Sequence, residues 1–568
     1  MSSDREEPGS DGIPEPDSGP DPDTDPMLFG AALAGLGKRL ANEPELVADT
    51  AMRFATGLAE LSAVVAARAQ GATTSGPIPT DEPDARFSDS AWESNPGFYG
   101  LRQCYLLWAQ TMKDLAEAGR DEELGGKAEF AVDQLVDAFA PTNFLFGNPA
   151  ALTRAFETGG GSITRGFARF ADDFASNGGW PRQVDATALE LGTDLAATPG
   201  QVVFRNRLME LIQFAPRTET VFETPLLLSP PWINKYYVMD LAPGKSFAEW
   251  AIDHGHTVFC ISYRNPDESF RDIGLEDYLR EGPLQALDVI GEITGAKQVN
   301  VAALCLGATL TAVMLGHLAR TKAGRERVRS ATLLNALVDF SEPGQLGNFV
   351  DPTTVERLEQ RMAKRGYLGA DEMAGTFNLL RSNDLVWRYV SSSWLMGEDP
   401  PAFDILQWNA DSTRMPARMH SEYLRSMYLE NRLSEGTFEI DGRKVSLNKS
   451  PADLYVLSAR EDHIAPWQSC YKTTQLAGGP VRFVLTSSGH IAGIVNPPGP
   501  KRRHWVNDEL PADAEAWLSA ATEVQGSWWE NWASWAAERG GERVEPPTLG
   551  SKAHPPLEEA PGSYVREV

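Results

Sequence analysis

The sequence contains few cysteines and no long apolar run. Its 568 residues include only four cysteines, Cys104, Cys260, Cys305 and Cys470, which are far apart in the chain and form no CxxC pair. Such scattering argues against a disulfide framework and against a zinc site, and it is typical of proteins of a reducing cytosol. No run of about 18 uncharged apolar residues occurs, so we expect no transmembrane helix.

Positive charge is also scarce. The chain has 51 Lys and Arg against 79 Asp and Glu, a formal net charge of −28. This balance argues against binding to nucleic acid, because the phosphates require a basic face. Residues 1–26 are strongly acidic and lack the apolar core of a signal peptide, so we expect them to form a disordered acidic tail. We therefore expect a cytoplasmic protein.

The usual sequence signs of a cofactor site are missing as well. No GxGxxG or GxxxxGKS/T segment stands between an expected strand and an expected helix, which leaves nucleotide binding unsupported. No cluster of His, Cys and Asp has the spacing of metal ligands. We expect neither a bound cofactor nor a metal ion.

The first part of the chain has a helical pattern. Apolar residues recur at helical spacing between Met27 and Gln70, which predicts two amphipathic helices. Residues 71–84 are rich in Gly, Thr, Pro and Asp and are predicted to be a linker. Residues 91–215 are again mainly helical in pattern. Together these features predict a helical N-terminal domain over residues 27–215.

The pattern changes after Pro216. Short apolar runs with strand character follow, at Thr224–Ser229, Thr257–Ser262, Val299–Leu304, Ser330–Asn335, Asp453–Ser458 and Val481–Leu485. Helical segments lie between them, at Ser246–His254, Leu275–Thr294 and Leu306–Arg320. This alternation predicts βαβ units and a buried parallel sheet, and so an α/β catalytic domain over residues 216–568. Residues 341–449 interrupt the alternation where such an enzyme carries a cap.

Cys305 stands between an apolar strand and a helix and is flanked by small residues. That arrangement is typical of a nucleophile elbow, with cysteine in place of serine. The small residues are needed because the turn is tight, and the N–H groups at the start of the helix favour a thiolate and an oxyanion. Ala303 occupies the position where such elbows usually hold glycine. The alternative is that Cys305 is a buried core cysteine, as expected for Cys260.

Two further residues follow strands in the order that such an enzyme requires. Asp462 comes after Asp453–Ser458, and His490 lies in a glycine-flanked loop after Val481–Leu485. Active sites of α/β sheets form at the carboxyl ends of the strands. The order Cys305, Asp462, His490 is the nucleophile, acid, base order of the α/β-hydrolase fold, so we predict this fold and this catalytic set. Glu461 and His463 are the competing acid and base.

Taken in order, several blocks resemble the polyhydroxyalkanoate synthases, the polyester synthases of bacterial storage granules. Besides the elbow, the blocks are Pro230–Asp240, Gly255–Phe259, Arg264–Asp267, Arg381–Trp387, Arg460–Trp467, Ser488–Gly493, Asn496–Pro498, His504–Trp505 and Gly526–Trp529. The helical N-terminal domain resembles that of the type I and II enzymes, which need no second subunit. The chain departs from the usual Gly-x-Cys-x-Gly-Gly at Ala303 and Ala308, which bears on turnover rate and substrate range more than on reaction class.

The resemblance implies that (R)-3-hydroxyacyl-CoA is polymerised with release of CoA. Cys305 would carry the acyl group, His490 would make it a thiolate, and Asp462 would either orient His490 or help to activate the hydroxyl. A thiolate attacking a thioester, followed by attack of a 3-hydroxyl on the acyl-enzyme, is sound covalent catalysis. The resemblance also implies a place at polyester granules, with a growing polyester chain and granule-associated proteins as partners.

Other residues are weaker candidates. We expect the Leu306 N–H to be one oxyanion donor, and the loop near Ile233 and Asn234 to hold a second. Asn234, Tyr237 and Asp240 either line the pocket or brace a rigid loop.

The cap and the C-terminal region carry two more open alternatives. Arg381 either meets a CoA phosphate or forms a salt bridge within the cap. Four tryptophans at near-helical spacing, Trp528, Trp529, Trp532 and Trp535, are expected to pack in a core or interface rather than to bind polymer.

Two rival functions stay open. One is a Cys-type hydrolase or acyl-CoA thioesterase of the same fold, which would pass the acyl group to water. The other is a granule-associated scaffold with a vestigial site, against which the complete set Cys305, Asp462 and His490 argues. The helical N-terminal half and the cap lead us to expect a homodimer.

Overall fold

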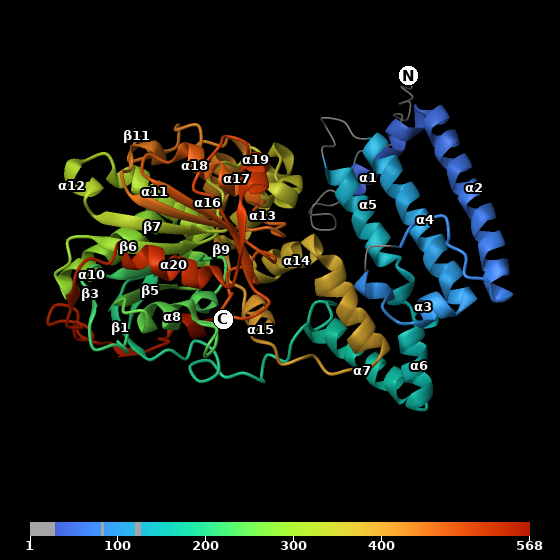
Figure 1. Cartoon of the computed structure of the whole chain (residues 1–568), viewed down its shortest axis with the longest axis horizontal. Coiled ribbons are helices and arrows are strands. Elements are labelled where there is room, and N and C mark those ends of the chain that lie inside the picture. The colour runs from blue at the N-terminus through green and yellow to red at the C-terminus, as the bar shows by residue number, and fades with distance from the viewer. Residues whose placement is uncertain (1–28, 81–83, 120–125) are drawn as a thin grey trace, which may run out of the picture.

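A computed structural model of the chain describes residues 29–80, 84–119 and 126–568. The expected acidic tail at residues 1–26 lies outside the described residues, as do residues 81–83 of the expected linker. The molecule has two lobes, a helical lobe from the first third of the chain and a larger α/β lobe from the rest (Figure 1). Among the described residues, no helix is long and apolar enough to cross a membrane.

The helical lobe confirms the two helices expected between Met27 and Gln70. Its helices are α1 (Phe29–Ala41), α2 (Pro44–Ala69), α3 (Ala91–Ser94), α4 (Pro96–Ala118), α5 (Lys127–Ala138), α6 (Pro149–Glu157) and α7 (Gly161–Ser176). The Asn95 side chain caps α4 and the Asn148 side chain caps α6, and each helix begins with a proline, the preferred start for a helix. Trp92 and Tyr105 lie in the small core of this lobe.

A mixed sheet forms the centre of the α/β lobe. The strands lie in the order β15 (Thr522–Gln525), β14 (Arg503–Val506), β13 (Val481–Thr486), β12 (Asp453–Ala459), β7 (Val328–Leu334), β6 (Val299–Leu304), β4 (Leu226–Ser229), β5 (Val258–Tyr263), β2 (Met209–Phe214), β1 (Gly200–Arg205) and β17 (Glu558–Glu559). The six strands from β13 to β5 are parallel and confirm the six expected apolar runs. The strands at both ends are antiparallel.

Helices cover both faces of this sheet (Figure 1). On one face pack α10 (Gln285–Thr294) and α11 (Leu306–Leu318), and on the other α8 (Phe247–Asp253) and α20 (Trp528–Ala537). Side chains of a strand alternate between the faces, so Leu227 belongs to one core and Leu228 to the other. The expected segment Leu275–Thr294 is split into α9 (Leu275–Leu279) and α10 by a kink at Gly282 and Pro283. This follows from the missing N–H of proline.

The prediction that residues 91–215 are mainly helical is wrong for the last part of this range, because β1 and β2 belong to the central sheet. The error has a physical cause. Glu210 and Gln213 in β2 are polar yet fully buried, so the strand lacks the apolar pattern of its neighbours. Glu210 is accommodated because it accepts hydrogen bonds from the Arg205 side chain and from the Ser563 and Tyr564 backbone.

The segment between β7 and β12 contains the expected cap and more. It includes the helices α13 (Pro352–Arg365), α14 (Ala370–Leu380), α15 (Asp404–Ala410) and α16 (Ala417–Tyr423), and the three π-helical segments η8 (Asn383–Trp387), η9 (Val390–Leu395) and η10 (Leu424–Leu429). From α14 to η9 it packs against the helical lobe (Figure 1). Asp137 of α5 accepts hydrogen bonds from Ser382 and Asn383, at 2.6 Å each. The insertion thus joins the two lobes as well as covering the sheet.

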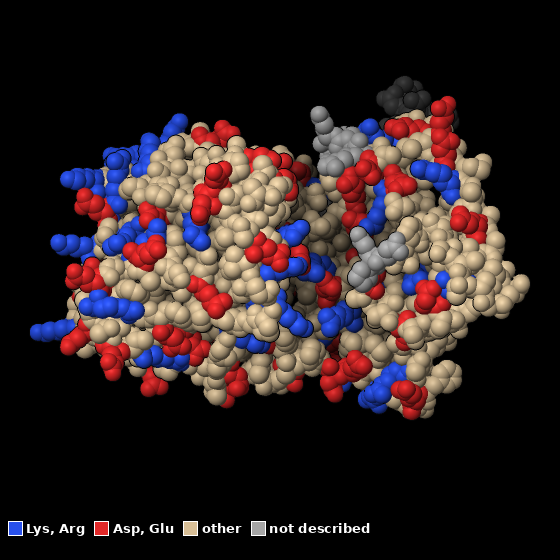
Figure 2. Space-filling model, viewed as in Figure 1, with Lys and Arg blue, Asp and Glu red and all other residues tan. Residues whose placement is uncertain are grey.

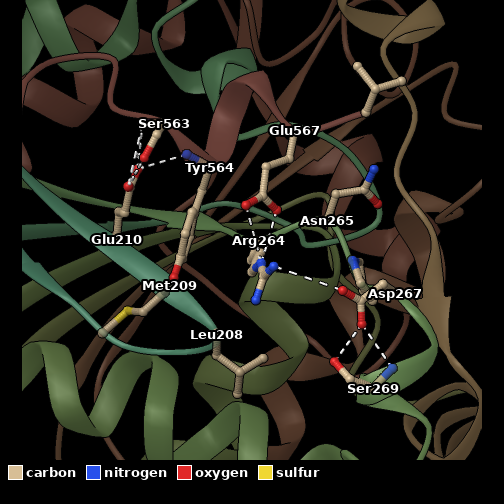
Figure 3. Close-up of polar contacts among 12 residues, drawn as sticks. Leu208, Met209, Glu210, Arg264, Asn265, Asp267, Ser269, Ser563, Tyr564 and Glu567 are labelled. Atoms are coloured by element: carbon tan, nitrogen blue, oxygen red, sulfur yellow. Dashed lines mark hydrogen bonds and ion pairs between the residues drawn. The ribbon is translucent and has the colours of Figure 1, made fainter.

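The C-terminal segment crosses the α/β lobe. β17 pairs with β1, and the chain then reaches Arg264, whose guanidinium lies 3.0 Å from the Glu567 carboxylate (Figure 3). The Tyr564 hydroxyl donates to the Asn206 carbonyl at 2.7 Å, and the Lys235 ammonium donates to the Glu567 carbonyl. These contacts fix residues 558–567 against β1 and against the loops that follow β1, β4 and β5.

Candidate active site

Cys305 lies in the tight turn between β6 and α11. Its φ of 51° and ψ of −120° are values that residues other than glycine rarely adopt, and such strain is typical of functional turns. Its N–H donates to the Leu334 carbonyl at 2.9 Å, which ties the turn to β7. The side chain is partly exposed, whereas Cys260 is fully buried in β5. The strand, turn and helix expected of a nucleophile elbow are confirmed.

Close packing explains the small residues of this turn. A Cβ atom on Gly307 would lie 2.2 Å from the Ser229 carbonyl oxygen, at the end of β4. Ala303 and Ala308 are completely buried, so the methyl groups at these two positions are fully accommodated. The close approach brings the loop after β4 against the start of α11.

His490 and Asp462 meet at the carboxyl ends of β12 and β13. Asp462 Oδ2 lies 2.6 Å from His490 Nδ1, and both residues are 7% exposed. Asp462 Oδ1 accepts hydrogen bonds from the Ile464 and Ala465 N–H groups, at 2.9 Å each. The carboxylate is therefore fixed by the backbone on one side and by the histidine on the other. The other ring nitrogen of His490 does not bind Asp462, and the Cys305 side chain is near enough to raise the pKa of His490.

The charge state of His490 follows from these neighbours. Burial lowers the pKa of His490, but the Asp462 carboxylate and the Cys305 side chain outweigh burial and hold this pKa well above its usual value. A proton taken from Cys305 is thus stabilised on the imidazole between two negative groups. The arrangement can generate a nucleophilic thiolate.

The loop that carries His490 is held from two sides. The Asn335 side-chain amide, just after β7, donates to the His490 carbonyl. Behind the loop, the indole N–H of Trp528 donates to the Gly493 carbonyl at 2.8 Å, and that of Trp529 donates to the Ile494 carbonyl at 2.9 Å. All four tryptophans of α20 are buried, which confirms their expected place in a core. The sequence analysis missed Asn335, although a polar residue directly after a buried strand was a usable signal.

The expected oxyanion region lies beside Cys305. Leu306 is the first residue of α11, so its N–H has no partner within the helix. Ile233 packs with Cys305 in the same apolar cluster, and Asn234 pairs with Ser412 of the insertion in an isolated β-bridge. The neighbouring Lys235 is held by the C-terminal segment. The loop after β4 is thus fixed by three separate parts of the chain.

Tyr237 and Asp240 brace this loop and are not brought to Cys305 by any of their hydrogen bonds. The Tyr237 hydroxyl donates to Asp411 of the insertion at 3.0 Å. Asp240 is buried and accepts hydrogen bonds from the Thr198 and Ser246 hydroxyls. Burial raises the pKa of Asp240 to about 6, although these two hydrogen bonds oppose the shift. Of the two expectations for these residues, their contacts match the bracing of a rigid loop.

Arg381 lies at a cavity between the lobes. Its guanidinium forms an ion pair with Asp384. The guanidinium also lies close to Gly489, the residue before His490: a Cβ atom added to Gly489 would be 3.6 Å from one of the Arg381 nitrogens. The cavity has a volume of about 320 Å³, and Glu461 and His463 also line it. Burial lowers the pKa of His463 to about 4, which favours the neutral ring. The structure therefore pairs Asp462, rather than Glu461, with His490, and gives neither competing residue the contact to Cys305.

An aromatic group from the insertion lies near Cys305. The rings of Phe340, Tyr423 and Tyr428 contact one another, with centroids 5.0 to 6.0 Å apart. Burial raises the pKa of both tyrosines, and the nearby Cys305 raises it further. A small apolar pocket between α11 and the insertion is lined by Trp232, Leu306 and Tyr423, among others. Apart from Leu306, the sequence analysis did not single out these residues, which give Cys305 apolar surroundings.

Comparisons with known proteins extend over both lobes. Residues 83–251 match the family model described as Poly-beta-hydroxybutyrate polymerase (PhaC) N-terminus, and residues 213–497 match the alpha/beta hydrolase fold. The chain is 45% identical over 531 residues to a poly(3-hydroxyalkanoate) polymerase of Methylorubrum extorquens. The aligned region covers 92% of this chain and 87% of the relative.

Two further relatives carry the name poly(3-hydroxyalkanoate) polymerase subunit PhaC. The protein of Rhizobium meliloti (strain 1021) is 44% identical over 506 residues, with 88% of this chain and 82% of the relative covered. The protein of Cupriavidus necator is 39% identical over 545 residues, with 94% and 90% covered. The similarity is therefore not confined to the α/β lobe.

Proposed function

Because the chain belongs to the PhaC family of poly(3-hydroxyalkanoate) polymerases, we propose that Cys305, His490 and Asp462 carry out its acyl transfer. The protein is an acyltransferase of this family with the α/β-hydrolase fold. Its substrate is a hydroxyacyl-CoA, and we propose the (R)-3-hydroxyacyl form. The observation that carries the assignment of residues is the 2.6 Å contact between Asp462 and His490 beside the strained turn at Cys305.

The first half of the reaction loads the enzyme. His490 takes the proton of the Cys305 thiol, and the thiolate attacks the carbonyl carbon of the CoA thioester. The resulting oxyanion is stabilised by the Leu306 N–H, with a second donor from the loop at Ile233 and Asn234. The carbon–sulfur bond to CoA then breaks, and the imidazolium of His490 returns its proton to the departing thiolate. CoA leaves, and the acyl group stays on Cys305.

The second half lengthens the polymer. The 3-hydroxyl of the next hydroxyacyl-CoA gives its proton to His490 and attacks the acyl-Cys305 thioester. An ester bond forms, the bond to Cys305 breaks, and the thiolate is regenerated. The lengthened chain, still a CoA thioester, then acylates Cys305 again with loss of CoA. The hydrogen bond from His490 to Asp462 supports a role for Asp462 in orienting the base.

The surroundings of Cys305 support transfer to a hydroxyl rather than to water. Tyr423 and Tyr428 lie near the thiol and contact Phe340, and such apolar surroundings disfavour hydrolysis of the acyl-enzyme. The cavity at Arg381 is a suitable entry for CoA, whose phosphates this guanidinium would meet. We further propose that the enzyme works as a homodimer at polyester granules in the cytoplasm, together with granule-associated proteins.

The test is incubation of the purified protein with (R)-3-hydroxybutyryl-CoA, with measurement of thiol release and isolation of the product. We expect thiol release with insoluble polyester, and a loss of at least about a thousandfold in Cys305→Ala. Cys104→Ala is the matched control, because Cys104 is a partly exposed cysteine in the helical lobe. Free hydroxy acid without polyester would assign a hydrolase instead, and full activity of Cys305→Ala would refute the proposed nucleophile.

A further inference from the structure

Helix α7 presents large apolar side chains to solvent. Ile163, Phe167, Phe170 and Phe174 are 42%, 69%, 38% and 71% exposed. Their spacing of four, three and four residues places them on one side of the helix. Ring centroids of Phe167 and Phe170 are 6.3 Å apart, and those of Phe170 and Phe174 are 6.1 Å apart. We call these four residues the phenylalanine stripe.

The side of α7 that faces the protein lies about a quarter turn from the stripe and carries small and polar residues. Ser162 and Gly166 are buried, and a Cβ atom on Gly166 would lie 1.9 Å from the Trp394 carbonyl oxygen of η9. Asp173 is also buried and accepts a hydrogen bond from the Trp394 indole at 2.8 Å. A surface helix normally turns its apolar side inward, whereas α7 buries its small and polar side and leaves most of its apolar side exposed. The close contact at Gly166 fixes this orientation and keeps the stripe exposed.

Most charged residues near the stripe are paired within the chain; Arg165, on the side of α7 away from the stripe, donates to the Gly397 carbonyl at 3.4 Å. Arg169 pairs with Asp399 and Arg182 with Asp172. On α6, which precedes α7 at one end of the helical lobe (Figure 1), Arg154 pairs with Glu157 at 3.8 Å. These cations are therefore not left to attract an anionic surface, and Figure 2 shows acidic side chains spread over the molecule.

We propose that the phenylalanine stripe is a docking surface for the polyester product. The proposal rests on the proposed function, because that reaction generates the occupant at the enzyme itself. A polyester is neutral, apolar and rich in ester carbonyls, and it carries no N–H groups. A surface of phenylalanine and isoleucine meets such a polymer without leaving a donor or a charge unpaired.

Two other occupants fit less well. An anionic membrane surface would require free Lys or Arg around the stripe. A folded protein partner is typically met by Tyr, Trp and Arg as well as Phe in the centre of an interface, and the stripe offers only Phe and Ile. A second copy of this chain is the remaining competitor, which the experiment separates from polyester.

The experiment measures cosedimentation of the full chain with protein-free amorphous poly(3-hydroxybutyrate) particles, in the absence of any CoA substrate. We expect Phe167→Ser with Phe174→Ser to weaken binding by at least about tenfold, since two large apolar side chains are lost from the contact. The matched control is Val47→Ser with Met52→Ser, which removes two exposed apolar side chains from α2 and should leave binding unchanged. The single variants Phe167→Ser and Phe174→Ser should each show part of the loss.

Three parallel measurements decide the outcome. Thiol release from soluble (R)-3-hydroxybutyryl-CoA at early times should be unchanged in the stripe variant, as should the mass in solution measured by light scattering. Unchanged binding to particles would overturn the proposal, and so would a loss of dimer with intact particle binding. The proposal would also be overturned if the wild type bound neutral phosphatidylcholine vesicles as well as it binds polyester particles, and if the stripe variant lost both kinds of binding to the same extent. If the wild type bound the particles but released no thiol from the CoA substrate, the proposed function would be refuted and the proposed docking surface would stand.

Discussion

Asn335 holds the proposed catalytic histidine, His490, from the end of β7, two strands away in the sheet. Its side-chain amide donates to the His490 carbonyl, and its own N–H donates to the Leu457 carbonyl of β12 at 2.9 Å. Asn335 has a φ of 44°, so the backbone is in the left-handed region at this point. One residue after β7 thus links the strand beside Cys305 to the loop that carries the base.

Replacement of Asn335 tests this link. Asn335→Gly keeps the left-handed backbone accessible but removes the amide, whereas Asn335→Ala removes the amide and adds backbone strain. We expect both variants to lower kcat on the order of ten- to a hundredfold at nearly unchanged KM, because His490 is less well placed. Only Asn335→Ala should also lower Tm. Wild-type kcat in Asn335→Gly would show that the hydrogen bond has no positioning role.

The charge of Asp462 should determine the pH at which activity falls on the alkaline side of the pH–rate profile. The pKa of His490 is held above its usual value partly by this carboxylate, so the imidazolium that protonates CoA persists to a higher pH than in a free histidine. Asp462→Asn lowers this pKa. We expect the alkaline limb of the thiol-release rate to move to lower pH and the rate at the optimum to fall by about 10²- to 10⁴-fold. Glu461→Gln is the control for the alternative acid, and an equal shift there would contradict the assignment.

Gly307 should tolerate no side chain. A Cβ atom at this position would lie 2.2 Å from the Ser229 carbonyl oxygen, which is backbone and has no room to move. We expect Gly307→Ala to lower Tm and to abolish thiol release, because it separates the loop after β4 from the start of α11. Gly291→Ala on α10 is the matched control, since its nearest atom would be 3.4 Å away. A Gly307→Ala variant with normal Tm would contradict the packing described here.

The buried carboxyl of Asp240 should make stability depend on pH. Its pKa of about 6 in the folded protein exceeds the ordinary value of 3.8, so the folded state binds more protons between these values. The contribution of Asp240 to stability is therefore lost as pH rises from about 4 to about 6, by at most about 3 kcal/mol.

The variant Asp240→Asn measures this effect. Both hydroxyl hydrogen bonds reach one oxygen of Asp240, which an asparagine carbonyl replaces, while the buried charge is removed. We expect Tm of the variant, relative to the wild type, to increase between pH 5 and pH 7. A difference in Tm that does not change with pH would show that Asp240 does not titrate in this range.

The parallel part of the sheet was predictable because its strands are continuous apolar runs between amphipathic helices. β1 and β2 were not, because the burial of Glu210 and Gln213 depends on contacts with residues some 340 positions later, such as Ser563 and Thr548. A local pattern carries no information about such partners. Short edge strands such as β17 are equally invisible, since pairing with β1 alone defines them.

The order of Cys305, Asp462 and His490 was predictable because each follows a recognisable strand. The roles of Tyr237 and Asp240 were not, because the choice between pocket and brace depends on Asp411, Thr198 and Ser246 in distant segments. For Arg381 the sequence left open a salt bridge or a CoA contact. The structure gives the salt bridge to Asp384 and also the neighbouring cavity, and the CoA contact stays a proposal.

The two outer strands of the sheet, β15 and β17, both come from the last fifty residues. A nascent chain on the ribosome therefore possesses Cys305, Asp462 and His490 before it possesses either edge of its sheet. Unpaired edges invite association with other chains. Ribosomes stalled before residue 522 should accordingly yield polypeptides that have every proposed catalytic group and nevertheless aggregate.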